Sequence, residues 1–150
     1  MNIEKVIDVF SRQKENLKSM LAAIKEKQTA LINRDNQALE QSIKQEEKIL
    51  LNIQVVEKER LSMFEDLNYS DYQINDNKLT TLLEKIKNNI SNETYVNLQT
   101  LDASIKNYIS EIIRVNKQNM LLIQQRRQFI SDTINAVLSS TNKSLIDRKG

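Results

Sequence analysis

Few side chains in this sequence could carry out chemistry. Adjacent Glu46 and Glu47 come closest to a pair of catalytic carboxylates. Neighbouring residues on a helix project about 100° apart, so these two carboxylates do not readily share one ligand. The sequence has no His and no Cys, which removes the usual general base, the commonest metal ligand and thiolate nucleophiles. Its only glycine is Gly150, so a glycine-rich phosphate loop is impossible. We therefore expect no enzymatic activity, no cofactor and no metal site.

The charges of the chain exclude two further classes of function. The sequence has 22 basic and 20 acidic residues, a net charge of +2, and the basic excess lies within residues 98–150. This excess is too weak for nucleic-acid binding, which needs clustered Lys and Arg. Arg126 and Arg127 are interpreted as part of a solvated face or as contacts for acidic groups on a partner. The longest apolar run, Met120 to Ile123, is far shorter than the ~20 residues of a membrane span. Because the N-terminus has no apolar signal region, we expect a cytoplasmic protein.

The elements that hold these residues are predicted to be long helices, because proline is absent and glycine occurs only at the end. Apolar residues recur at steps of four and three from about residue 3 to residue 32, and again from Leu39 to Leu67. The two patterns are out of phase across residues 33–36, where Asp35 is placed to cap a new helix. An antiparallel pairing would set Lys14 near Glu57. This predicts an αα-hairpin, with one continuous helix as the alternative.

The second half of the chain is predicted to hold a loop and two more helices. Asn68 is suited to the left-handed conformation that ends a helix, and residues 69–77 are dense in turn-forming residues. A short amphipathic helix covers about residues 79–90, and a long helix covers about residues 94–139. The predicted fold is all-α, an elongated antiparallel helical bundle. Residues 1–139 would form one domain, and residues 140–150 a mobile tail.

Helix lengths predict a surface that the bundle leaves uncovered. At 1.5 Å per residue, hairpin helices of roughly 30 residues span about 45 Å, and a final helix of roughly 45 residues spans about 68 Å. The C-terminal end of the last helix would then extend about 20 Å beyond the hairpin. This end still has an apolar face, which must meet the tail, a second copy or a partner.

Several motifs occur in an order that resembles one known family. Asn116-x-x-Asn119 is followed at once by Met120 to Ile123, and then by Phe129, Ile130 and Ile134. The first half adds Leu31-x-x-x-Asp35-x-x-x-Leu39, and Glu46-Glu47 with Leu50, Leu51 and Arg60. Together they resemble the FlgN-type flagellar export chaperones over roughly residues 5–138. The family often has a glycine after its second long helix, where this chain has Asn68.

The resemblance implies a cytoplasmic chaperone for flagellar type III secretion. Such a protein holds hook–filament junction proteins unassembled and delivers them to the export gate and its ATPase complex. It implies that the last helix binds the client, and that an aromatic in this helix docks on the gate, a role for which Phe129 is the candidate. The client-binding residues would be Met120, Leu122, Ile123, Arg126, Arg127, Ile130, Ile134, Val137 and Leu138.

Two interpretations stay open at this point. Asn116 and Asn119 could recognise a partner, or they could fix the register of the last helix through bonds within the subunit, as Asp35 fixes the turn. The protein could also be a self-associating coiled-coil adaptor or structural protein, in which the same apolar stripe forms a homo-oligomer.

Overall fold

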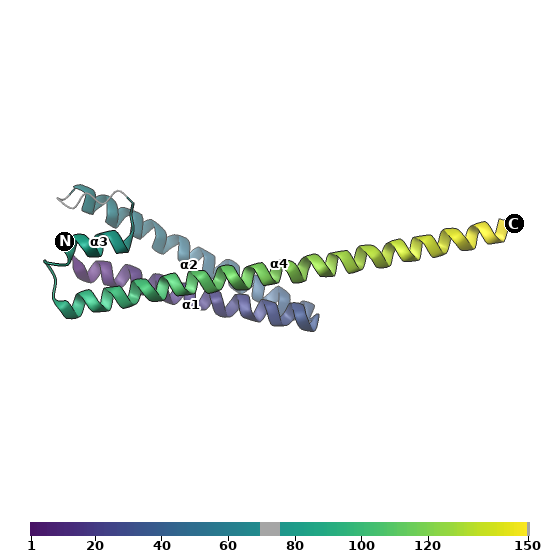
Figure 1. Ribbon diagram of the computed structural model, residues 1–150, viewed down its shortest axis with the longest axis horizontal. Coiled ribbons are helices and arrows are strands. Elements are labelled where there is room, and N and C mark those ends of the chain that lie inside the picture. Colours follow the sequence, from purple (N-terminus) through teal and green to yellow (C-terminus); the bar gives the residue numbers. More distant parts are fainter. Residues whose placement is uncertain (70–75, 150) are drawn as a thin grey trace.

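The all-α prediction is confirmed by a computed structural model, which describes the backbone of residues 1–69 and 76–149 and the side chains of residues 1–67 and 76–140. Four helices make up this part of the chain, and it holds no strand: α1 (Ile3–Asn33), α2 (Asn36–Tyr69), α3 (Leu79–Ile86) and α4 (Asn92–Lys149). The molecule is elongated, and α4 extends far beyond the other helices (Figure 1).

The predicted turn between the first two helices forms, and it excludes one continuous helix. Arg34 adopts a left-handed conformation (φ 54°) that ends α1. The Asp35 carboxylate then accepts a hydrogen bond from the backbone N–H of Ala38, at 3.0 Å. This bond satisfies one of the free N–H groups at the start of α2. Asn2 caps α1 in the same way, accepting from Lys5 N at 3.2 Å.

Helix α1 is the central element of the molecule. Helices α2 and α4 each pack along α1, and they make no backbone-level contact with one another. The short helix α3 packs on α4, and its side chains join the core between the other helices. In Figure 1, α3 lies at the end of the molecule that holds the N-terminus. This arrangement leaves an open face between α2 and α4 beyond α3.

The hairpin register differs from the predicted one. The predicted contact of Lys14 with Glu57 does not form, because Arg60 on the same helix holds the Glu57 carboxylate. The ion pairs that join α1 to α2 are instead Arg12 with Glu59 and Lys27 with Glu46, the latter at 3.3 Å.

The buried face of α2 is turned by about one residue from the predicted face. Ser42, Ile49, Val56 and Met63 lie seven residues apart and are at most 5% exposed. Predicted seam residue Leu50 is 48% exposed. Helix α2 has apolar side chains on two adjacent faces, and the face that begins with the small Ser42 packs on α1.

The largest core lies around α3. Phe64, Leu82, Ile86 and Leu98 are fully buried, one or more from each of α2, α3 and α4, and Phe10 of α1 meets Phe64 edge to face at 6.3 Å between ring centroids. A two-turn helix is not stable alone, so this packing is what holds α3 in place.

Several predicted element ends shift. Helix α2 continues through Asn68, which was predicted to end it, to Tyr69. Helix α3 ends at Ile86, short of residue 90. The predicted loop covers residues 70–75, which lie outside the described residues.

The last helix is longer than predicted at both ends. Helix α4 begins at Asn92, after Ser91 accepts a hydrogen bond from Thr94 N at 3.1 Å, and it continues past residue 139 to Lys149. The mobility of residues 140–150 and the domain boundary at residue 139 stay predictions.

Candidate partner-binding surface on α4

Asn119 anchors the middle of α4 on α1. Its side chain is 2% exposed, and its Nδ2 donates a hydrogen bond to the carbonyl oxygen of Ile24 at 3.1 Å. The Oδ1 atom is buried and has no hydrogen-bond partner in the structure. Gln28 adds a bond to Gln118 at 2.9 Å. Because the Asn119 bond is possible in one axial position only, it fixes how far α4 slides along α1. Asn116 is exposed and makes no such contact.

The contacts of α4 with the hairpin end near its turn. Arg126 donates a hydrogen bond to Asn36 Oδ1 at 3.2 Å, and the Arg34 guanidinium lies 5.7 Å from the ring centroid of Phe129. Leu122, Ile123 and Arg126 are half-buried at this level. Every described residue from 127 to 140 is exposed.

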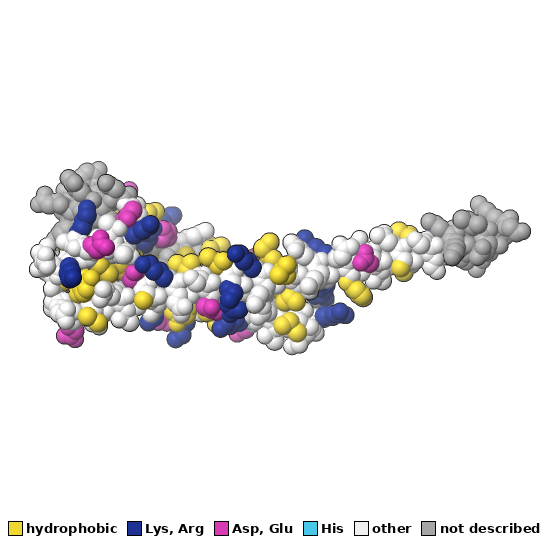
Figure 2. Space-filling model, in the orientation of Figure 1, with side chains coloured by type: hydrophobic (Ala, Val, Ile, Leu, Met, Phe, Trp, Pro, Cys, Tyr) yellow, Lys and Arg dark blue, Asp and Glu magenta, His cyan; other side chains and the backbone are white. Residues whose placement is uncertain are grey.

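We call residues 131–149 the overhang. At 1.5 Å per residue it is about 28 Å long, somewhat longer than the sequence predicts. Its described apolar side chains are exposed, as are those just before it: Met120 59%, Phe129 60%, Ile130 49%, Ile134 53%, Val137 58% and Leu138 56%. Figure 2 shows these apolar groups on a thin helix with no neighbouring element. Burying such side chains is worth about 25 cal/mol per Å², so this surface favours a partner.

Two hollows lie on either side of α4 where the overhang begins. One, of about 500 Å³, is lined by Leu31, Arg34, Leu122 and Phe129 among others. The other, of about 320 Å³, lies toward α2 and is lined by Lys27, Leu31, Leu39, Ile43, Ile123, Arg126, Arg127 and Ile130. Both combine apolar walls with guanidinium groups. Such sites suit an amphipathic helix with acidic residues beside its apolar face.

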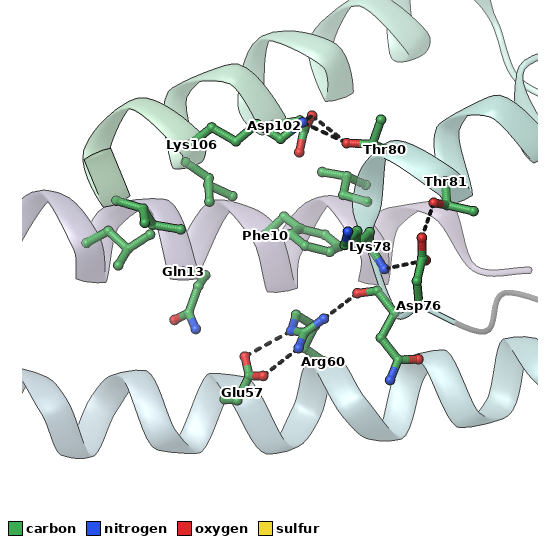
Figure 3. Close-up of a pocket in the computed structure, with 15 residues that line it drawn as sticks. Phe10, Gln13, Glu57, Arg60, Asp76, Lys78, Thr80, Thr81, Asp102 and Lys106 are labelled. Carbon is green, nitrogen blue, oxygen red and sulfur yellow. Dashed lines mark hydrogen bonds and ion pairs between the residues drawn. The ribbon is translucent and has the colours of Figure 1, made fainter. Parts of the chain in front are cut away.

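A larger cavity, of about 690 Å³, lies at the other end of the molecule beside α3. Figure 3 shows Phe10 of α1 at its centre, with α2 on one side and α4 on the other. Lys106 of α4 contacts both Asp102, at 2.9 Å, and Thr80 of α3, at 2.8 Å. Opposite, Arg60 of α2 donates to the carbonyl oxygen of Asn77. These polar groups tie α3 to both long helices.

The charged groups of this cavity are paired within the molecule. Hydrogen bonds from Arg60 hold the pKa of Glu57 below its ordinary value of 4.5, against the opposing effect of burial. The pKa of Asp76 is lowered by hydrogen bonds from the Thr81 hydroxyl and the Lys78 backbone N–H. Paired charges with shifted but unused protons indicate structural roles. Within the described residues, no cluster of acidic side chains could hold a metal ion.

The cavity and the hollow toward α2 are the two ends of one surface, which we call the α2–α4 channel. Glu57, Leu17 and Ile109 line the cavity, and Ile43 lines the hollow. Helical periodicity places the residues in between on the same faces: Leu50 lies seven residues from both Ile43 and Glu57 on α2, and Ile113 and Met120 continue from Ile109 on α4. Apolar side chains are visible along this face in Figure 2.

The sequence interpretation missed this channel. It assigned Ile43 and Leu50 to the contact with α1, but Ile43 is 38% and Leu50 48% exposed. A signal was present in the sequence: α2 has a second heptad series, Ser42, Ile49, Val56 and Met63, and a helix with two apolar faces needs two partners.

Comparison with known families decides the classification. A model of the FlgN protein family matches residues 1–149. The chain belongs to the FlgN family. The family implies a role as a flagellar export chaperone and is not an enzyme family. Comparisons with curated proteins and with solved structures gave no match for this FlgN-family chain. No helix among its described residues is long and apolar enough to cross a membrane.

Proposed function

We propose that this protein is a cytoplasmic export chaperone that binds hook–filament junction proteins through α4 and delivers them to the flagellar type III export gate. The observation that carries the proposal is the exposed apolar face of α4 beyond the hairpin, in a chain of the FlgN family. Ile130 and Ile134, one helical turn apart, are its centre.

The binding mechanism is burial of apolar surface. An amphipathic segment of the client lies along α4, with Met120, Leu122 and Ile123 at one end of the contact and Val137 and Leu138 at the other. Both partners then hide surfaces that would otherwise aggregate. Ordering the client costs free energy, so only part of the burial energy becomes affinity. Reversible binding suits a chaperone that must release its client.

Charge selects the client and the docking surface. Arg126 and Arg127 stand beside the apolar face, so an acidic segment is attracted and a basic one is repelled. The Phe129 ring is 60% exposed and contacts only Arg34 by its face. We propose that Phe129 docks on the export gate or its ATPase complex, because it is the one large aromatic on this part of α4.

Co-expression with each hook–filament junction protein tests the proposal. The change is the double substitution I130D/I134D, which places two charges in the apolar face. Retention of the client should be lost, while the helical circular dichroism signal and the melting temperature stay unchanged.

The matched control is L51D/V55D on the outer face of α2. Its two positions have the same four-residue spacing and similar exposure, 63% and 57%. The control should retain the client. Equal retention by both variants, or a collapse of the I130D/I134D melting transition, would contradict the proposal.

The second candidate function is that of a self-associating coiled-coil adaptor, which the same exposed stripe also supports. A homo-oligomer that resists salt and captures no junction protein would favour this alternative.

A further inference from the structure

Two apolar surfaces of opposite shape lie uncovered on the same chain. The overhang is a single amphipathic helix without a neighbour, and the α2–α4 channel is a concave face with α1 as its floor and no helix in it. The short helix α3 already occupies one end of this channel. Its four apolar residues there, Leu79, Leu82, Leu83 and Ile86, are at most 4% exposed. The channel thus accepts a helix, and the chain fills only part of it.

The lengths of the two surfaces agree. The open part of the channel runs from Lys106, which contacts α3, to Arg126, which contacts the hairpin turn. These 20 residues correspond to about 30 Å, and the overhang is about 28 Å long. Because α4 is one continuous helix, the overhang points away from the channel of its own chain (Figure 1). It can reach only the channel of another molecule.

We propose that the α2–α4 channel binds the overhang of a second copy, in a reciprocal dimer that masks the client-binding face. With the two hairpin turns end to end and the chains antiparallel, each overhang enters the channel of the other copy. One twofold axis then covers all four exposed surfaces, as an isologous interface requires. Near the axis, Ile134 of each copy lies against Ile43 of the other.

The area of this interface is sufficient for a stable dimer. A helix about 10 Å across and 28 Å long hides roughly 450 Å² when half its surface is covered. Two overhangs and two channels together bury about 1,800 Å², within the range of specific interfaces. The consequence for the chaperone cycle, which rests on the proposed function, is that a client must displace the second copy to reach Ile130 and Ile134.

Cross-linking is a clean test because the chain has no natural cysteine. Copies with I43C are mixed with copies with I134C and treated with a short bismaleimide. A cross-linked product of twice the 17.5 kDa chain mass is expected. The matched control is Q41C, an exposed position at the same level of α2 but on the face opposite the channel, which should give no product with I134C. Equal yields for Q41C and I43C would overturn the proposal.

Sedimentation equilibrium of the full chain gives an independent measurement. The wild type should change from monomer to dimer between about 1 and 100 μM, an affinity ordinary for such an interface. I113D, in the channel wall, should weaken dimerisation about tenfold or more, and V55D on the outer face should not.

The two proposals fail in different ways. A chain that stays monomeric at every concentration but retains its client refutes the dimer alone. A cross-linked dimer that retains no junction protein refutes the proposed function alone.

Discussion

The two halves of α4 have similar apolar content and opposite environments. Leu98 and Val115 are at most 1% exposed, because α1 and α3 cover them, whereas Ile130 and Ile134 are about half exposed. Both halves belong to one unbroken helix, so helix propensity does not separate them. What differs is the presence of neighbours. The first half of α4 stabilises the fold, and the second half presents a surface for partners.

The largest effect should come from the covered half. Replacing Phe64, which is fully buried against Phe10, by Ala should lower the free energy of unfolding by about 3–5 kcal/mol. The matched change I134A on the overhang should lower it by less than about 0.5 kcal/mol. Urea unfolding followed by circular dichroism measures both. Similar losses for the two variants would show that the halves do not differ in this way.

A charge at Asn119 tests the anchor between the two halves. In N119D a carboxylate would be buried against the Ile24 carbonyl oxygen, and we expect a loss of about 3 kcal/mol at pH 7. Burial should raise the pKa of this carboxyl group above its unfolded value. The variant should therefore recover stability relative to the wild type as the pH falls from 7 to 4. A loss independent of pH would mean that the side chain turns toward water.

The cap of α2 tests the turn from which α4 departs. D35A removes the acceptor of the Ala38 N–H bond, and we expect a loss of about 1 kcal/mol in the free energy of unfolding. D35N keeps an acceptor and should restore most of it. Equal losses for the two variants would show that the Asp35 bond is not the source of the stability.

The smallest effect concerns the cavity beside α3. The Glu57 carboxylate has a lowered pKa because Arg60 binds its charged form. Its contribution is therefore present above the ordinary pKa of 4.5 and is lost as the pH falls through the lower folded value. E57Q should cost under about 1 kcal/mol at pH 7, because the pair is partly exposed, and nothing at pH 2. Thermal melts at the two pH values measure the difference, and a cost that persists at pH 2 would contradict it.

The sequence predicted those features that local chemistry determines. The turn at Asp35 and the four helices follow from a cap, a phase change and the absence of proline. The excess length of α4 follows from counting residues. These signals need no knowledge of distant contacts.

Other features depend on packing that a single sequence does not reveal. Ile43 and Leu50 have the spacing of a seam with α1, and only the competing series from Ser42 to Met63 decides which face is buried. The start of α4 at Asn92 and its continuation to Lys149 cross weak local signals, because Ser and Asn are compatible with both helix and loop. The exposure of Ile130 and Ile134 is visible only once the hairpin end is placed.

Hydrogen exchange with and without a junction protein tests the central claim most directly. If the exposed face of α4 holds the client, backbone amides within residues 120–138 should exchange more slowly in the complex, while those of α1 should keep their rates. Protection restricted to α1 and α3, with unchanged exchange along residues 120–138, would contradict the account.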